Sequence, residues 1–226
     1  MSWDINDEKV IPKDSTLNLY FLRHGETAYS QTGGFCGFTD AELTSEGKQM
    51  AQQFADAYKH IEFEGVYCSS LKRCIETARP LASAQGKEIE HRDGLKEINY
   101  GTWEGLTHDF VKEQFADDYE KWIAEPGWNA PTGGETAFQI AGRSMNVIGE
   151  ILFTHLSGNV LVVSHKATIR IIICCLLGIE LGRYRDRVSA LAGSLSVIKM
   201  GKHGPLLELL NDRSYMSQDL RSRTGT

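Results

Sequence analysis

The sequence predicts a three-layer α/β protein in which helices cover both faces of a mainly parallel central sheet. Short apolar runs of strand length alternate with longer segments of helical periodicity, which is typical of βαβ units. The chain has 226 residues, 41% hydrophobic and 24% charged, which suits one core of ordinary size. Finding no repeat or linker, we predict a mobile leader over 1–16, a single domain over 17–210 and a loose, polar tail over 211–226.

The strands are expected where apolar runs stop at polar residues or glycine. The expected strands are Leu17–Arg23, Gly65–Cys68, Glu88–His91, Asn159–Val163, Ser194–Met200 and Leu206–Leu210. The last two surround the turn Gly201–Gly204, so we expect them to pair as a hairpin.

The helices are expected between these strands. They are Thr44–Tyr58, a helix from Ser69 or Ser70 to about Ala84, Glu135–Leu156, and Ala167–Leu177. Thr44 or Ser45 is the expected N-cap of the first helix, and Ser69 or Ser70 of the second, because a hydroxyl can accept from free backbone N–H groups. Gly178 is expected to end the last helix.

Two segments are expected to be irregular or only partly helical. Gln31–Asp40 reads as a glycine-rich loop. The segment 92–134 is predicted to contain short helices and loops that cap the site, and Ala124–Gly134 within it has the composition of irregular chain.

Charge and cysteine content exclude some classes of protein. The net charge of −6 argues against a nucleic-acid surface, and no apolar run is long enough for a membrane span. The first sixteen residues are polar and do not resemble a secretory signal. The odd number of cysteines, five, without an export signal predicts reduced thiols in the cytoplasm. Because their spacing is not C-x-x-C, we expect no zinc site.

Histidines follow two of the expected strands directly. His24 comes after the first strand, and His165 after the strand that ends near Val163. Ligands of open parallel sheets bind beyond the carboxyl ends of the strands. Neighbouring strands lie about 4.8 Å apart, so the two histidines can face each other across one phosphate. The helix after His165 would also direct backbone N–H groups at an anion.

Two arginines and a glutamate complete the candidate site. Arg23 adjoins His24, and Arg73 falls in the first turn of a helix, where a cation is unfavourable unless an anion lies nearby. Glu97 is the candidate proton donor, because a bound phosphate dianion favours its protonated form. Taken singly, Arg73 also fits a surface salt bridge, Glu97 a solvated carboxylate, and each histidine a structural role. Together they indicate phosphoryl chemistry on a histidine.

Several ordered motifs resemble the histidine phosphatase superfamily, also called the phosphoglycerate mutase-like family. The resemblance covers about Leu17 to Met200 and implies the fold of that family. Its motifs are RHGET at 23–27, GFTDAELTSEGKQMA at 37–51, SSLKRCIETA at 69–78, EINYGTWEG at 97–105 and VLVVSH at 160–165.

The resemblance also implies roles for the candidate residues. His24 would be the nucleophile that becomes phosphohistidine, and Glu97 would donate a proton to the leaving group and later activate water. Arg23, Arg73 and His165 would hold the phosphoryl group. Because these groups supply the electrostatics, the resemblance implies no metal and no other cofactor.

Two positions depart from the family pattern. Lys166 stands where glycine usually follows the closing histidine; its backbone N–H can still bind phosphate, while its side chain changes the charge of the pocket. Ser30 replaces the asparagine that commonly ends the opening motif and contacts phosphate or substrate in relatives. The predicted phosphate-binding residues are Arg23, Arg73 and Lys166, and the predicted substrate contacts are Ser30, Cys36, Gly37, Asn99 and Tyr100. The candidates for recognising the leaving group are Asn99, Tyr100, Lys166 and the loop Gln31–Phe38.

The expected activity is hydrolysis of a small phosphorylated metabolite. Mutases of the family carry a basic, proline-rich insertion after the acid motif, whereas segment 106–134 here is acidic, so hydrolysis is favoured over mutase activity. Phosphoserine is the leading substrate, and α-ribazole phosphate, a sugar phosphate or a phosphohistidine protein remain open. The aspartate-nucleophile, C-x₅-R and P-loop motifs of other phosphoryl-transfer enzymes are absent from the sequence.

Two alternatives concern the protein's wider role. A non-catalytic binding protein is disfavoured because His24, Glu97 and His165 are all present. The late hairpin around Gly201–Gly204 and the polar tail are candidates for a homodimer contact or for a cover over the pocket, and the sequence leaves both open.

Overall fold

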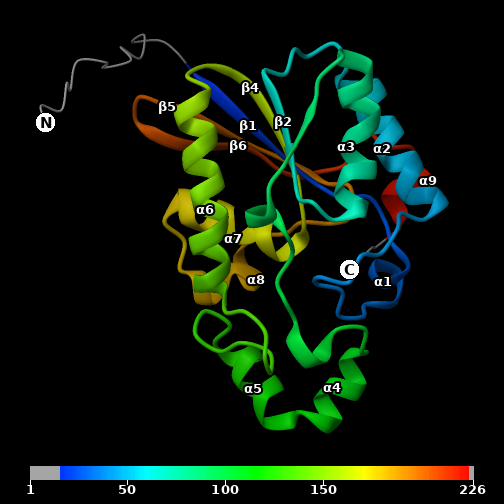
Figure 1. The fold of residues 1–226 in the computed structure, drawn as a ribbon, viewed down its shortest axis with the longest axis vertical. Coiled ribbons are helices and arrows are strands. Elements are labelled where there is room, and N and C mark those ends of the chain that lie inside the picture. Colours follow the sequence, from blue (N-terminus) through cyan, green and yellow to red (C-terminus); the bar gives the residue numbers. More distant parts are fainter. Residues whose placement is uncertain (1–15, 224–226) are drawn as a thin grey trace, which may run out of the picture.

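A computed structural model describes residues 16–223, so the predicted leader lies outside the described residues except for Thr16 (Figure 1). Within the described part of the chain, six strands form one sheet in the order β3-β2-β4-β1-β5-β6. The strands are β1 (Leu17–Arg23), β2 (Gly65–Cys68), β3 (Ile89–His91), β4 (Gly158–Ser164), β5 (Leu195–Gly201) and β6 (Gly204–Asp212). All six predicted strands are confirmed: β1 and β2 have the predicted bounds, and the ends of the other four differ from the prediction by at most two residues.

The centre of the sheet brings the two histidine-bearing strands together. β1 and β4 pair in parallel, and Arg23 lies opposite Ser164. β2 pairs in parallel with both β4 and β3, whereas β5 runs antiparallel to β1 and to β6. The prediction of a mainly parallel sheet is therefore confirmed, and His24 and His165 leave neighbouring strands at the same edge.

Helices cover both faces of the sheet, which confirms the predicted three layers (Figure 1). One face carries α6 (Ala137–Thr154), α7 (Lys166–Leu177) and α8 (Tyr184–Arg187), with the 3₁₀ turn η3 (Leu181–Arg183) before α8. The other carries α2 (Ser45–Tyr58), α3 (Lys72–Gln85) and α9 (Gln218–Ser222). Successive side chains of a strand point to opposite faces. Accordingly, Phe21 packs in the core under α6 and α7, and Leu22 in the core under α2 and α3.

The helix ends test the predicted caps. Thr44 caps α2 through a 3.0 Å hydrogen bond from Gly47 N, and Gly178 ends α7 in the left-handed conformation, as predicted. The prediction that Ser69 or Ser70 caps α3 is wrong, because Leu71 occupies that position without a side-chain bond. The two hydroxyls have other partners: that of Ser69 bonds His165, and that of Ser70 bonds Asp93.

The segment 92–134 runs past α6 to one end of the molecule, where its helices lie below the sheet in Figure 1. It contains the 3₁₀ turns η1 (Asp93–Leu95) and η2 (Gly101–Trp103) and the helices α4 (His108–Gln114) and α5 (Ala116–Ala124), and it is irregular from 125 to 134. Phe35, Trp103, Val111 and Trp122 form a small core there. Phe35 belongs to the predicted loop 31–40, which begins with the last two residues of α1 (Ala28–Thr32).

The polar tail packs against the body of the protein, so the expectation of a loose tail is wrong for residues 211–223. Met216 and Leu220 are 3% exposed and form a cluster with Met50 of α2. Beyond α9, Arg223 forms a two-pronged ion pair with Glu26, at 2.7 and 2.9 Å. The average composition of the segment is polar, and it therefore gave no sign that Met216 and Leu220 are buried.

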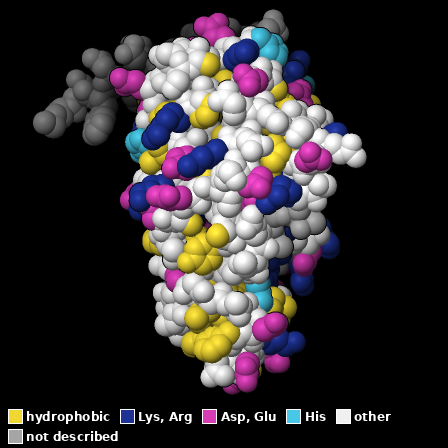
Figure 2. Space-filling model, turned by 90° about the vertical axis from the view of Figure 1, so that its right-hand side faces the viewer, with side chains coloured by type: hydrophobic (Ala, Val, Ile, Leu, Met, Phe, Trp, Pro, Cys, Tyr) yellow, Lys and Arg dark blue, Asp and Glu magenta, His cyan; other side chains and the backbone are white. Residues whose placement is uncertain are grey.

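The surface bears charges of both signs. Figure 2 shows Lys and Arg side chains interspersed with Asp and Glu over the face that it presents, and hydrophobic side chains in separate groups. None of the helices between residues 16 and 223 combines the length and apolar character needed to span a membrane.

The tail packing gives a first testable prediction. Leu220→Ala should lower the free energy of unfolding by about 2–3 kcal/mol, because it removes a buried side chain and leaves a cavity. The matched control, Leu206→Ala, removes the same atoms from a side chain that is 59% exposed and should change stability by less than about 0.5 kcal/mol. Urea unfolding measures the free energy of unfolding of both variants. An equal decrease in Leu220→Ala and Leu206→Ala would contradict the packing of the tail.

Candidate active site

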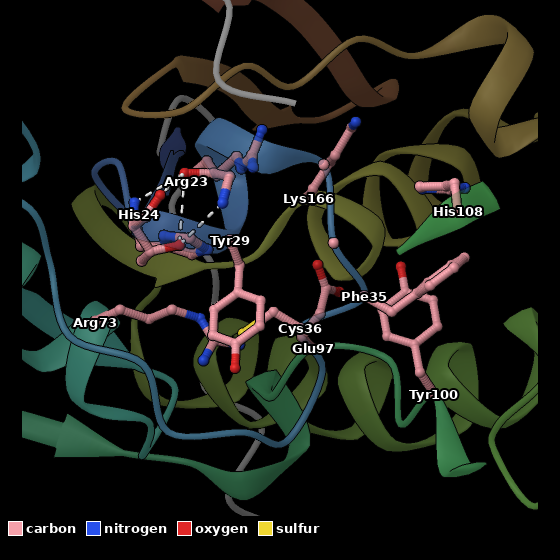
Figure 3. Close-up of a pocket in the computed structure, with 14 residues that line it drawn as sticks. Arg23, His24, Tyr29, Phe35, Cys36, Arg73, Glu97, Tyr100, His108 and Lys166 are labelled. Atoms are coloured by element: carbon pink, nitrogen blue, oxygen red, sulfur yellow. Dashed lines mark hydrogen bonds between the residues drawn. The ribbon is translucent and has the colours of Figure 1, made fainter. Parts of the chain in front are cut away.

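A pocket of about 160 Å³ opens at the carboxyl ends of β1 and β4 (Figure 3). Of the residues predicted from the sequence, its wall contains Arg23, His24, Ser30, Cys36, Arg73, Glu97, Tyr100 and Lys166. Three predicted residues are not on the wall, namely His165, Gly37 and Asn99. The wall also contains Gly33, Gly34 and Phe35 of the predicted loop 31–38, and three residues that the sequence did not single out, namely Thr27, Tyr29 and His108.

His24 is held as a neutral imidazole. Its Nδ1 lies 2.7 Å from the carbonyl oxygen of Gly25, which can only accept, so the ring proton is on Nδ1 and the lone pair is on Nε2. Burial, followed by the nearby cations Arg73 and Arg23, lowers the pKa of His24 well below 6.5. A neutral imidazole with a free Nε2 lone pair is the form that can attack phosphorus.

His165 lies beside His24 but is fully buried, with the ring centroids 5.1 Å apart. Its Nδ1 accepts a 3.1 Å hydrogen bond from Arg73 Nε, so its Nε2 carries the proton, which it donates to Ser69 Oγ at 2.8 Å. Burial and the adjacent Arg73 lower the pKa of His165 well below 6.5. Both ring nitrogens therefore have protein partners, Nδ1 with Arg73 and Nε2 with Ser69, and direct contact of His165 with a phosphoryl group stays a prediction.

Arg73 is fixed by the loop 37–39 rather than by a surface salt bridge. Its side chain is buried, and its Nη1 and Nη2 donate to the carbonyl oxygens of Thr39 and Gly37 at 2.8 and 2.7 Å. Glu104 in turn holds this loop, because its carboxylate accepts from the backbone N–H groups of Gly37, Phe38 and Thr39 at 2.9–3.2 Å. Gly37 thus supports Arg73, and a Cβ there would lie 2.1 Å from Ile98 O.

Glu97 occupies the start of α7. Its carboxylate accepts from the backbone N–H groups of Ala167, Thr168 and Ile98 at 3.0–3.3 Å, and its side chain is buried. The N–H groups of Ala167 and Thr168 in the first turn of α7, which were expected to face a bound anion, are therefore directed at Glu97. This arrangement holds the carboxylate in place on the pocket wall.

Arg143 of α6 fixes the backbone around Glu97. Its Nη1 donates to the carbonyl oxygens of Gly94 and Lys96, its Nη2 donates to Glu97 O at 2.9 Å, and its guanidinium pairs with Glu135. The sequence analysis did not identify Arg143, since only the fold places its side chain under this loop.

Asn99 shapes the turn after Glu97. Its Oδ1 accepts a 2.8 Å hydrogen bond from Gly101 N, and its backbone N–H donates to Glu135 at 2.9 Å. The structure thus gives Asn99 local partners within this turn and Glu135, away from the pocket wall.

Ser30 and Cys36 are uncharged parts of the wall. The Ser30 hydroxyl lies 2.8 Å from Thr27 N and donates to Thr27 O at 2.9 Å, which closes the capping box of α1. Burial raises the pKa of the Cys36 thiol to about 11, so this thiol remains protonated at neutral pH.

The far part of the wall is aromatic. The ring of Phe35 lies 4.2 Å from that of His108 and 4.9 Å from that of Tyr100, measured between centroids. Within residues 16–223, no group of three or more His, Cys, Asp or Glu side chains is arranged to hold a metal ion.

Comparison with known proteins identifies the class. Residues 19–213 match the family model described as "Histidine phosphatase superfamily (branch 1)", and the chain belongs to this superfamily. It is a phosphatase, an enzyme that hydrolyses phosphoric monoesters.

Three relatives illustrate the similarity. "Phosphoserine phosphatase 1" of Hydrogenobacter thermophilus is 29% identical over 202 residues, covering 89% of this chain and 95% of the relative. "Adenosylcobalamin/alpha-ribazole phosphatase" of Escherichia coli is 29% identical over 200 residues, covering 88% and 97%. The crystal structure of the alpha-ribazole phosphatase from Shigella flexneri superposes with a TM-score of 0.80 at 26% identity, covering 89% and 99%. These similarities confirm the histidine phosphatase fold.

The buried histidines predict a pH dependence of stability. The folded protein keeps His24 and His165 neutral, whereas the unfolded chain binds protons on them below about pH 6.5. The free energy of unfolding is therefore undiminished above pH 6.5 and decreases as the pH falls below this value, by up to about 1.4 kcal/mol per pH unit for each histidine. Urea unfolding at pH 7 and pH 5 should show a smaller loss in His24→Gln than in the wild type. The matched control is His203→Gln, which removes an exposed histidine; an equal loss in all three proteins would contradict this account.

The loop contacts predict a role for Glu104. Glu104→Gln removes the charge that holds the loop 37–39, so Arg73 loses its fixed geometry, and kcat should fall by about 10- to 100-fold. The control Glu113→Gln alters an exposed glutamate in the same segment and should leave kcat unchanged. Steady-state kinetics would contradict the role if Glu104→Gln kept the wild-type kcat.

Proposed function

We propose that this protein hydrolyses phosphoserine to serine and inorganic phosphate, without a metal ion, through a phosphohistidine on His24. The observation that carries the proposal is the small pocket around a neutral His24. Its volume of about 160 Å³ is below the roughly 300–1,000 Å³ usual for sites that bind drug-sized ligands. A small leaving group such as serine suits this space, and the similarity to a protein named phosphoserine phosphatase supports the choice.

The first step transfers the phosphoryl group. The Nε2 lone pair of His24 attacks phosphorus, the bond from phosphorus to the ester oxygen breaks, and Glu97 gives its proton to that oxygen. The products are serine and a phosphohistidine whose ring carries a positive charge. Gly25 O accepts from the Nδ1–H of that ring, and Arg23 and Arg73 offset the charge of the phosphoryl oxygens.

The second step releases phosphate. The Glu97 carboxylate takes a proton from a water molecule, whose oxygen attacks phosphorus as the bond to Nε2 breaks. His24 returns to its neutral form and Glu97 to its protonated form, so both groups are ready for another cycle. We place this reaction in the cytoplasm, where the five free cysteines would stay reduced.

Substrate release assays test the proposal. Phosphate release should be fastest from phosphoserine in a panel that also contains phosphothreonine, 3-phosphoglycerate, α-ribazole phosphate and sugar phosphates, with excess EDTA throughout. His24→Ala should lower turnover by about a thousandfold or more, whereas His203→Ala, at an exposed turn, should not.

Each other outcome would change the conclusion. Fastest release from α-ribazole phosphate would give this chain the activity named for its Escherichia coli relative. Isomerisation of 3-phosphoglycerate in the presence of bisphosphoglycerate, without phosphate release, would make it a mutase. Inhibition by EDTA, or turnover by purified His24→Ala, would contradict the mechanism.

A further inference from the structure

Lys166 is a cation on the pocket wall for which the two-step reaction has no use. It is the first residue of α7, it follows His165 directly, and its side chain is half-buried. Figure 3 shows Lys166 on the wall between Arg23 and His108. Glycine, the residue usual for the family at this position, would leave this part of the wall without charge.

The surroundings of Lys166 are unfavourable for an ammonium group. Among the described residues it has no hydrogen bond or ion pair from its side chain. Burial, with repulsion from Arg23 and Arg170, lowers the pKa of Lys166 to about 8, and Glu97 is the one acidic group that opposes this shift. The first turn of a helix also disfavours a cation. An anion that entered the pocket beside Lys166 would therefore be stabilised.

The position of Lys166 indicates which anion this is. Arg73, His24 and Arg23 surround the phosphoryl side of the pocket, and Figure 3 shows Glu97 between Arg73 and the rings of Phe35 and Tyr100. Because Glu97 protonates the ester oxygen, the leaving group must extend from Glu97 toward these rings. His108 lies on the same side of the pocket as Phe35 and Tyr100, and Lys166 lies between it and Arg23 (Figure 3), which puts Lys166 near the leaving-group side as well.

We propose that Lys166 binds a carboxylate of the leaving group, so that this phosphatase selects phosphomonoesters of small hydroxy acids over the same esters without the carboxylate. An ammonium and a carboxylate form a charge-assisted hydrogen bond, which is stronger in a partly buried site than in water. This inference rests on the proposed function in two respects, namely that the enzyme cleaves small phosphomonoesters and that Glu97 protonates the ester oxygen. Phosphoserine is one member of the class.

A matched pair of substrates tests the inference. O-phosphoethanolamine differs from phosphoserine only by lacking the carboxylate. The wild type should prefer phosphoserine in kcat/KM, and Lys166→Met, which keeps the length of the side chain without its charge, should reduce that preference by about 10- to 100-fold. Lys166→Arg should retain most of the preference. An unchanged preference in Lys166→Met would overturn the inference, because Lys166 would then act on the phosphoryl group or not at all.

A pH profile of the wild type needs no variant. The preference in kcat/KM should decline as the pH rises through about 8, because the ammonium form of Lys166 is lost there. The charged and titratable groups that face Lys166 are Arg23 on β1, Arg170 on α7, Glu97 and His108 on α4. Titration of the substrate amines is common to both members of the pair and largely cancels in the ratio. A preference that stayed constant from pH 7 to pH 9 would overturn the inference.

A second pair separates this inference from the proposed function. If the wild type does not cleave phosphoserine, the proposed substrate is wrong, and the same variants are measured with 3-phosphoglycerate against glycerol 3-phosphate. A preference for 3-phosphoglycerate that Lys166→Met reduces would support the carboxylate site with another substrate. A wild type without preference for the carboxylate member of either pair would overturn it.

Discussion

The carboxylate of Glu104 is the contact on which the phosphoryl side of the pocket depends. It accepts hydrogen bonds from the backbone N–H groups of the loop 37–39, and the carbonyl oxygens of that loop accept hydrogen bonds from Arg73. Arg73 Nε in turn bonds His165, whose other ring nitrogen is anchored by Ser69. A buried guanidinium needs such partners because it cannot lose its charge. One glutamate outside the pocket thus sets the direction of a cation inside it.

The proton-transfer side is built from different supports. Glu97 is held through its carboxylate by the first turn of α7 and through its backbone by Arg143 of α6. Its position therefore depends on two helices that share one face of the sheet, whereas Arg73 depends on a loop tied to α3. In the proposed mechanism, the cation that binds the phosphoryl oxygens and the acid that protonates the leaving group are therefore held by different sets of contacts.

The sequence predicted features that repeat locally, and it missed features that depend on distant partners. The apolar runs were sufficient for the sheet, and histidines at two strand ends were sufficient to place His24 beside His165. Ser69 was misread because the hydroxyl of a helix start normally caps, whereas here it bonds His165. Gly37 and Asn99 lie in motifs of the family, and the structure shows Gly37 bonded to Arg73 and Asn99 bonded to Gly101, which the motifs alone do not reveal. His108 was missed because nothing local distinguishes it from an exposed helical histidine.

The order of the strands sets the order in which the protein can assemble. β1 is made first, yet its neighbours β4 and β5 come from the second half of the chain. Glu26, which lies two residues after His24, has its partner Arg223 still later in the chain. Pairing between distant segments is slow, and an unpaired central strand is prone to misassociation during synthesis. The centre of the sheet can therefore form only after β4 and β5, from the second half of the chain, have been made.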